Sequence, residues 1–267
     1  MEELLWVSGL HGPARSIYGA TLGRQAALAR GKMRDFYRAV IQSGQRVFDV
    51  GANVGVLSAV FASLGARVVA LEPNADCVRH MQLSYADKQI EVIQAAVGAK
   101  NGIAVLNVAD DRDVRSSIAD DWIATMGAQD ASYQGIWSRR NVVPMLTLDC
   151  LVEHFGMPDF IKVDVEGFEE KVLSGLSAQP PLVSFEFTAA FLAPGLRCLD
   201  LEIFQPGSTF NFAYNRDWGY PTKFEENAWL EKNEIKKALL AVEGSDGQGD
   251  IFVRAPQATG KGKSDRA

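Results

Sequence analysis

Cysteine is scarce in this chain of 267 residues, which contains only Cys77, Cys150 and Cys198. They lie far apart, are odd in number and form no Cys-x-x-Cys pair, so the sequence predicts neither a disulfide framework nor a zinc site. We expect them to be reduced core residues, as in a cytoplasmic protein.

Long apolar runs and an excess of positive charge are also missing. No apolar stretch reaches the roughly 20 residues of a transmembrane helix, so no membrane span is expected. The opening Met1-Glu2-Glu3 lacks the basic start of a signal peptide. With 27 Lys and Arg against 33 Asp and Glu, the formal net charge of −6 argues against a nucleic-acid partner.

Alternating strand and helix signals are present instead. Together with 47% hydrophobic residues, they predict one α/β domain over residues 45–254. An N-terminal helical cap over 1–44 and a disordered tail over 255–267 would flank it. Besides the elements discussed below, the patterns predict helices over 22–41, 74–85, 147–155 and 225–241, and strands over 90–94, 209–214 and 250–254.

The most informative stretch is residues 47–58. An apolar run broken only by Asp49 enters the turn Gly51-Ala52-Asn53-Val54-Gly55, and residues with helical spacing follow. Strand, tight turn and helix in this order predict a nucleotide-binding loop. Glycine at positions 51 and 55 would let the backbone turn sharply and approach a ligand closely.

Two kinds of ligand suit such a loop. A dinucleotide site prefers Gly-x-Gly-x-x-Gly facing a pyrophosphate, and this loop lacks both the middle glycine and the spacing. Asp49 would repel a pyrophosphate but would accept hydrogen bonds from a ligand's ammonium group or from the loop amides. Glu72 ends the apolar run 68–71, about 20 residues after Gly51, where an acid reaches the ribose of either ligand. Asp49 therefore favours S-adenosylmethionine.

Carboxylates mark a second stretch, residues 160–169. An apolar segment predicts a buried strand, and Asp164 and Glu166 follow at its carboxyl end, where open α/β sheets bind ligands. Either acid would serve as a base, hold an acceptor hydroxyl or bind a divalent cation. Asp164 has the alternative of anchoring the loop amides. Glu186, in the next strand, is a third catalytic candidate or a structural residue.

Residues 48–55, 71–74 and 161–169 together resemble the FkbM-type family of S-adenosylmethionine-dependent methyltransferases, in which an asparagine stands at the position of Asn53. The resemblance covers about residues 45–190. It implies a Rossmann-like class I methyltransferase fold, with a seven-stranded, mostly parallel sheet and helices on both faces. It also implies O-methylation of a small-molecule or carbohydrate acceptor, such as a sugar, a glycolipid or a secondary metabolite.

These patterns define the expected cofactor site. Asn74 would cap a helix or touch the ligand, and Ala96 lies at a strand exit where a small residue suits a flat adenine. The predicted cofactor-binding residues are Asp49, Gly51, Ala52, Asn53, Gly55, Glu72, Asn74 and Ala96. A rival interpretation is an NAD-dependent oxidoreductase, and another is a non-catalytic partner protein that binds S-adenosylmethionine.

Residues 98–141 interrupt the alternation with a long polar stretch, which predicts a lid or insertion after a strand over 103–108. The family has a serine pair here, so Ser116 and Ser117 would line the substrate or cofactor pocket unless they are ordinary loop residues. Trp122, Tyr133 and Trp137 would stack on a sugar ring or pack the lid down.

Basic residues gather near the start of the chain. Between Arg15 and Arg46 there are seven Lys or Arg against the single acid Asp35. This segment is a solvated helix face or a surface that attracts an anionic substrate.

Overall fold

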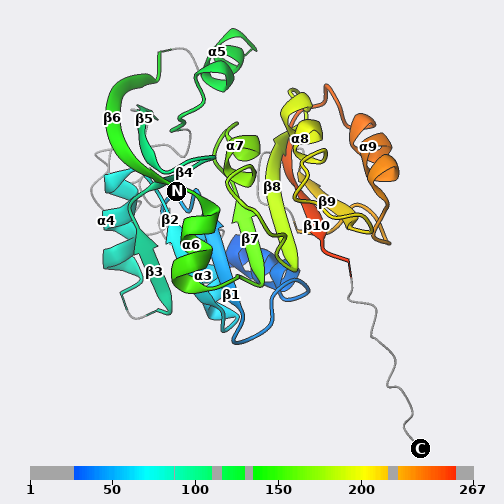
Figure 1. Cartoon of the computed structure of the whole chain (residues 1–267), viewed down its shortest axis with the longest axis horizontal. Helices are drawn as coiled ribbons and strands as arrows, with labels where there is room; N and C mark the ends of the chain where they lie inside the picture. Colours follow the sequence, from blue (N-terminus) through cyan, green and yellow to red (C-terminus); the bar gives the residue numbers. More distant parts are fainter. Residues whose placement is uncertain (1–26, 87, 110–115, 130–134, 216–221, 257–267) are drawn as a thin grey trace, which may run out of the picture.

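The computed structural model describes residues 27–86, 88–109, 116–129, 135–215 and 222–256. These residues form a seven-stranded sheet of order β3-β2-β1-β7-β8-β10-β9 and a three-stranded sheet of order β4-β6-β5 (Figure 1). The large sheet contains β1 (Arg46–Val50), β2 (Arg67–Leu71), β3 (Ile90–Ile93), β7 (Phe160–Val163), β8 (Leu182–Thr188), β9 (Thr209–Asn215) and β10 (Gln248–Arg254). The small sheet contains β4 (Ala96–Val97), β5 (Gly102–Ala109) and β6 (Trp137–Leu146).

Strand direction in the large sheet is almost uniform. The neighbours from β3 to β8 are all parallel, whereas β10 runs antiparallel to both β8 and β9. This mostly parallel sheet, with the helices described next, confirms the predicted class I methyltransferase fold. Because the carboxyl ends of parallel strands share one edge, the loops after β1, β2 and β7 meet there.

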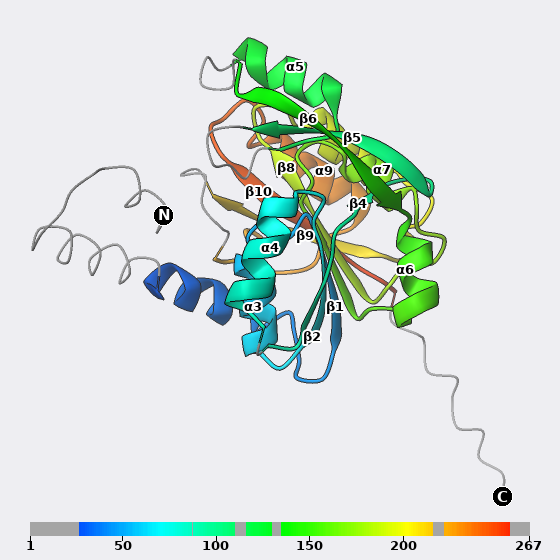
Figure 2. The ribbon, with the colours of Figure 1, turned by 90° about the vertical axis from the view of Figure 1, so that its left-hand side faces the viewer.

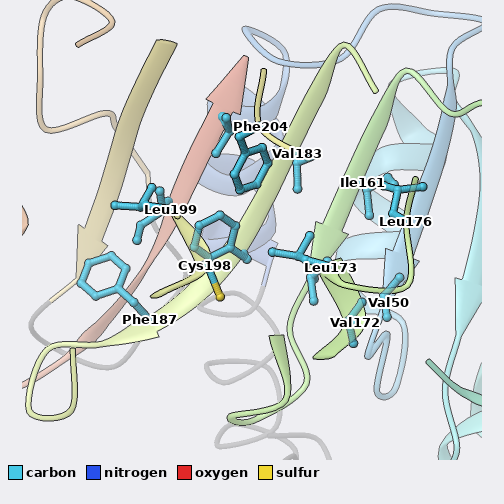
Figure 3. Packing of buried hydrophobic residues seen from close by; sticks show 14 of the residues in the cluster. Val50, Ile161, Val172, Leu173, Leu176, Val183, Phe187, Cys198, Leu199 and Phe204 are labelled. Carbon is cyan, nitrogen blue, oxygen red and sulfur yellow. The ribbon is translucent and has the colours of Figure 1, made fainter. Parts of the chain in front are cut away.

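Helices cover both faces of the sheet (Figure 2). The described helices are a segment over 27–37, α3 (Val56–Ser63), α4 (Ala75–Ser84), α5 (Asp120–Gln129), α6 (Leu148–Phe155), α7 (Glu169–Leu173), α8 (Ala193–Cys198) and α9 (Lys232–Leu240). The first segment, α3 and α4 pack with one face of the sheet into one buried cluster. Helices α6 to α9 pack with the opposite face into a larger one, part of which Figure 3 shows.

Side-chain caps set the start of two helices as predicted. Asn74 accepts a hydrogen bond from the Asp76 amide at the start of α4, and Thr147 accepts one from the Cys150 amide at the start of α6. Such a cap is worth about 1 kcal/mol to a helix. Each cap fixes the direction in which a helix leaves a strand end, so both shape the edge of the sheet where the loops meet.

The described part of the basic N-terminal segment is an amphipathic helix. Its Met33, Phe36 and Tyr37 are buried, and Tyr37 stacks edge to face against Phe61 of α3. The basic side chains of this helix and its end, Arg30, Lys32, Arg34 and Arg38, are exposed. This arrangement agrees with a solvated helix face, whereas residues 1–26 lie outside the described chain.

Some elements differ from the sequence-based expectation. Strand β6 and helix α8 were not predicted, and the helix expected over 225–241 covers only α9, because residues before it run along β9 through the Phe210–Leu230 bridge. Within the range 98–141, which was predicted to be a lid or insertion after a strand over 103–108, the described residues contain β5, α5 and part of β6. Of the tail predicted over 255–267, only 255–256 are described.

Two features of the described part of the chain concern its apolar helices and its cysteines. Its helices include none long and apolar enough to cross a membrane. Among the described residues, Cys77, Cys150 and Cys198 form no disulfide; Cys198 is buried, whereas Cys77 and Cys150 are partly exposed.

Candidate active site

A pocket lies at the carboxyl edge of the large sheet. Its empty volume, which includes space open to solvent, is about 570 Å³. The loops after β1, β2, β3 and β7 line it together with β5 and the residues before α5. The lining residues are Val50, Gly51, Asn53, Leu71, Glu72, Pro73, Asn74, Cys77, Ala95, Ala96, Val97, Leu106, Ser116, Ser117, Ile118, Asp164, Val165 and Glu166.

The loop after β1 depends on left-handed backbone conformations. Gly51, Asn53 and Gly55 have φ values of 81°, 51° and 79°. Glycine adopts this region freely, and asparagine is one of the few other residues that often does. A side chain at Gly51 would place its Cβ 1.7 Å from the Asp164 carbonyl oxygen. Gly51 is therefore required by the close approach of the chain after β7.

Glu72 links this loop to the end of β2. Its Oε2 accepts a hydrogen bond from the backbone N–H of Asn53, and its Oε1 accepts one from the backbone N–H of Asn74, each at 2.8 Å. Burial raises its pKa to about 7, although the two amide bonds oppose the shift. Each oxygen keeps a second lone pair, so the carboxylate can still accept hydrogen bonds from the hydroxyls of a ligand in the pocket.

Asp49 lies beneath the loop rather than on the pocket wall. It is 2% exposed, and its Oδ2 accepts the Ser58 hydroxyl of α3 at 2.5 Å. Burial raises its pKa to about 6. The hydrogen bond from Ser58 joins β1 to α3 across the loop. The described hydrogen-bond partner of Asp49 thus lies in α3, and Asp49 is not among the residues that line the pocket.

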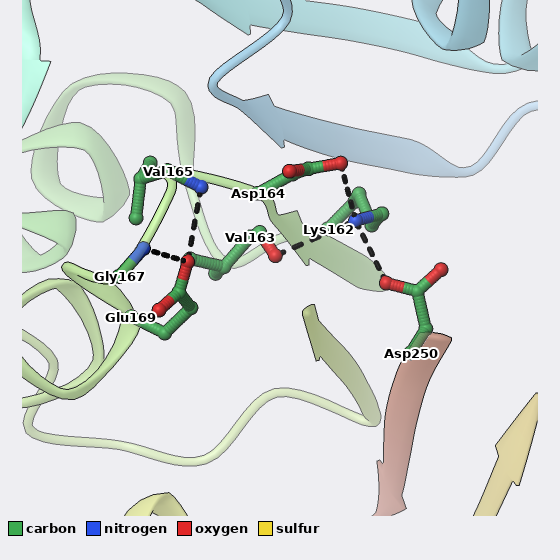
Figure 4. Close-up of polar contacts among 7 residues, drawn as sticks. All are labelled: Lys162, Val163, Asp164, Val165, Gly167, Glu169 and Asp250. Carbon is green, nitrogen blue, oxygen red and sulfur yellow. Dashed lines mark hydrogen bonds and ion pairs between the residues drawn. The ribbon is translucent and has the colours of Figure 1, made fainter. Parts of the chain in front are cut away.

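Hydrogen bonds with the side chains of Glu169 and Ser117 hold the turn after β7, and Figure 4 shows those of Glu169. Glu166 has φ 54°, which is uncommon for this residue type. Glu169 Oε1 accepts the amides of Val165 and Gly167, and the Ser117 hydroxyl donates to the Glu166 carbonyl at 2.8 Å. These bonds offset the cost of the left-handed conformation, which is of the order of 1–3 kcal/mol.

Three carboxylates converge beside this turn. One oxygen each of Asp164, Glu166 and Glu186 lies within 4.8 Å of the others. Burial, followed by the charges of Asp164 and Glu166, raises the pKa of Glu186 well above its usual value. The raised pKa favours the protonated form of Glu186, and in that form it would place a hydrogen-bond donor beside the carboxylate acceptors.

Residues 116–118, just before α5, form part of the pocket wall. Ser116 and Ser117 line it, and Trp122 is 5% exposed and packs against Gly167 and the Trp137 ring. The two tryptophans thus pack the insertion onto the turn after β7, while Tyr133 lies outside the described residues.

The part of the chain that forms this site matches a known protein family. A profile described as the Methyltransferase FkbM domain matches residues 49–220, which include the loops after β1, β2 and β7. The chain belongs to the FkbM methyltransferase family. Membership favours the methyl donor over the dinucleotide considered above, and implies S-adenosylmethionine as the cofactor of this FkbM protein.

Several solved methyltransferase structures are similar to the FkbM chain. The plantazolicin methyltransferase BpumL in complex with SAH is 9% identical with a TM-score of 0.43, covering 95% of this chain and 93% of that chain. The precorrin-6y C5,15-methyltransferase from Geobacter metallireducens is 12% identical with a TM-score of 0.38, covering 86% and 87%. A putative RNA methyltransferase from Pyrococcus horikoshii is 11% identical with a TM-score of 0.42, covering 85% and 83%. No curated protein matches the chain.

The residues of this FkbM site suit S-adenosylmethionine in their chemistry. Glu72 has lone pairs for ribose hydroxyls, and the apolar Leu71, Ala95 and Val97 suit an adenine ring. The carboxylates at the turn after β7 suit a positively charged sulfonium.

The structure places most of the predicted site residues of the FkbM domain around one pocket. Nine of them line it: Gly51, Asn53, Glu72, Asn74, Ala96, Ser116, Ser117, Asp164 and Glu166. Asp49, Ala52, Gly55 and Glu186 do not appear in the lining. A Cβ on Gly55 would meet Met81 of α4, so this glycine serves helix packing rather than ligand approach.

Other residues of the FkbM site were missed by sequence reasoning. Hydrogen bonds from Lys162 and to Glu169 hold the turn that carries Asp164 and Glu166. The pocket is also lined by Cys77 and Leu106. A lysine inside an otherwise apolar strand was a signal for Lys162, because a buried lysine is rare unless it is paired. The sequence carried no comparable signal for Cys77 or Leu106.

Glu169 makes the stability of the FkbM domain depend on pH. Burial raises its pKa from 4.5 to about 7, so between these values the folded protein keeps a proton that the unfolded chain releases. The free energy of unfolding should therefore fall as pH rises through this window, by an amount of the order of 3 kcal/mol from this group. Glu169→Gln retains an oxygen acceptor and should flatten this fall in urea titrations from pH 4.5 to 7.

The exposed α6 residue Glu153 provides the matched control, because Glu153→Gln should leave the pH dependence unchanged. An equal slope in Glu169→Gln and in the unmodified protein would contradict the assignment.

Proposed function

We propose that this protein transfers a methyl group from S-adenosylmethionine to a hydroxyl oxygen of a small-molecule or carbohydrate acceptor. The observation that supports the proposal is the convergence of Asp164, Glu166 and Glu186: one carboxyl oxygen of each lies within 4.8 Å of the others, and Asp164 and Glu166 line the pocket. A hydroxyl acceptor needs a group that takes its proton and a group that orients it, and this cluster offers both.

S-adenosylmethionine supplies an activated methyl group on a sulfonium. Asp164 and Glu166 line the pocket, so either carboxylate is placed to accept the hydroxyl proton. Burial raises the pKa of Glu186, which favours its protonated form, and in that form its carboxyl group would donate a hydrogen bond. The acidic cluster would repel phosphate or carboxylate groups, so we expect a neutral or cationic acceptor.

A divalent cation is a second way to use the same three acids. Hard cations prefer carboxylate oxygens, and a bound cation would acidify the acceptor hydroxyl. Three carboxylates supply only part of the usual six ligands of magnesium, so we favour the version without metal.

Cofactor binding tests the first half of the proposal. If Glu72 accepts the ribose hydroxyls, Glu72→Ala should weaken S-adenosylmethionine and S-adenosylhomocysteine alike, by about 1.5–3 kcal/mol each. The ribose does not change in the reaction, so turnover at saturating cofactor should barely move. Titration calorimetry measures both affinities. The exposed Glu91 on β3 provides a matched control as Glu91→Ala.

Because Glu72 also holds two loop amides, melting curves should accompany the titrations. A large fall in turnover with normal affinity would contradict the ribose assignment, and failure of the unmodified protein to bind either ligand would contradict the function itself.

A metabolite screen tests the second half. The protein is incubated with a cell extract and with methyl-labelled S-adenosylmethionine, and mass spectrometry detects compounds that gain the labelled methyl group. We expect labelled hydroxyl compounds, sugars among them, that are absent with heat-inactivated protein. Binding of cofactor without any labelled product would favour the non-catalytic alternative.

A further inference from the structure

A buried ammonium group lies behind the carboxylates of the site. Lys162 is the third residue of β7 and is 1% exposed among apolar strand neighbours. Its Nζ lies 3.0 Å from Asp164 Oδ2 and 2.8 Å from Asp250 Oδ1 on β10, as Figure 4 shows. The second contact is an ion pair rather than an aligned hydrogen bond.

The surroundings of Lys162 are acidic on every side. Asp164 follows it on β7, Asp250 faces it from β10, Glu186 acts on it from β8, and Asp49 interacts with it from β1. The buried Tyr37 hydroxyl, from the helix over 27–37, completes the group. Burial disfavours a lysine's charge strongly, so the charges of Asp164 and Asp250, the two acids in contact with Lys162, are what favour its charged form.

The two acids in contact with Lys162 differ in their exposure. The Asp250 side chain is 5% exposed and lies in the interior, whereas the Asp164 side chain is 29% exposed and lines the pocket. A purely structural ion pair needs only Asp250. Lys162 adds a hydrogen bond to Oδ2 of Asp164, and no described residue donates one to Oδ1. One carboxylate oxygen is thus fixed from behind, and the other is left for the pocket.

We propose that Lys162, held by Asp250, is a positioning residue for methyl transfer: it fixes the Asp164 carboxylate so that Oδ1 meets the acceptor. This inference rests on the proposed function, since it gives Asp164 a role in the reaction. It makes β10, a strand that contributes nothing to the pocket lining, part of the support of the site.

The direct test is the position of Asp164 in crystals of the full chain grown with S-adenosylhomocysteine. Lys162→Met removes the ammonium and retains the length of the side chain. We expect Asp164 in a single rotamer in the unmodified protein and in a shifted or multiple rotamer in Lys162→Met. The exposed Lys171 on α7 supplies the control Lys171→Met, which should leave Asp164 in place. An unmoved Asp164 in Lys162→Met would overturn the proposal.

Kinetics test whether Lys162 acts through Asp164. With the acceptor from the screen, Lys162→Met should lower kcat roughly ten- to a hundred-fold, the scale of a misplaced catalytic group. Affinity for S-adenosylhomocysteine should change by less than about threefold, because groups that do not touch the ligand contribute little to its binding. In an Asp164→Asn background the same substitution should change kcat by less than about threefold, because effects routed through one group do not add.

The positioning role would be overturned if Lys162→Met lowered kcat by the same factor in the Asp164→Asn background as in the unmodified protein. It would also be overturned if Lys162→Met lowered the affinity for S-adenosylhomocysteine by the same factor as kcat. Lys162→Met leaves Asp250 without its cation and endangers folding, so Lys162→Met with Asp250→Asn removes both charges and provides the second variant. Failure of the unmodified protein to transfer methyl groups would refute the proposed function, while the crystals would still report whether Lys162 holds Asp164.

Discussion

Asp164→Asn and Glu166→Gln are both expected to lower the rate of methyl transfer. For the variant that removes the base, the expected fall is about 10²–10⁴-fold. Both substitutions keep the shape of the side chain and remove its ability to take a proton. Affinity for S-adenosylmethionine should survive in at least one variant, because the acceptor proton is remote from the adenosine part of the cofactor. Initial rates at saturating cofactor, with the acceptor found by the metabolite screen, measure the effect.

The same assay separates proton transfer by the protein from metal assistance. Without a metal, a chelator should leave the rate of the unmodified protein unchanged. With a metal, the chelator should abolish the rate and magnesium or manganese should restore it. Full activity of both single variants, with and without chelator, would exclude both versions and shift attention to Glu186.

Gly51→Ala is expected to be the most destabilising single substitution in the cofactor loop. Gly51 has φ 81°, and an added Cβ would lie 1.7 Å from the Asp164 carbonyl oxygen, where backbone rather than a flexible side chain must shift. We expect a loss of more than about 4 kcal/mol, at the extreme of single substitutions, and loss of cofactor binding with it. Urea unfolding of the purified variant, or its absence from the soluble fraction, measures this.

Gly44→Ala separates the clash from the backbone strain. Gly44 has φ 87°, but an added Cβ would meet no atom within 4 Å. The cost should therefore be only the 1–2 kcal/mol of a left-handed residue with a side chain. Equal losses in the two variants would show that the approach of the chain after β7 does not constrain Gly51.

Local chemistry made much of the fold predictable. The positive φ of Gly51 and Asn53 and the caps at Asn74 and Thr147 depend on residues within a few positions of each other. Short continuous apolar segments, separated by helical patterns, predicted a mostly parallel sheet, because buried parallel strands have this kind of sequence. The sequence therefore located the pocket through its loops.

Most of what the sequence did not reveal depends on contacts between different secondary-structure elements. Asp49 suited a ligand ammonium by its position, but the structure pairs it with Ser58, one turn into α3. The contact of Lys162 with Asp250 joins β7 and β10, which lie on either side of β8 and come near each other only through the order of the sheet. The polar side chains of β6, from Ser138 to Asn141, face solvent, so the strand lacked the apolar alternation that signals one.

The late arrival of β10 in the chain has a consequence for biosynthesis. Chains emerge from the ribosome amino end first, and β10 inserts between β8 and β9 after every other strand has been made. Until residues 248–254 have left the exit tunnel, Lys162 has no Asp250, and β8 and β9 have no strand between them. The loops after β1 and β2 are complete long before this, so the nascent protein holds a cofactor loop well before it holds a finished catalytic edge.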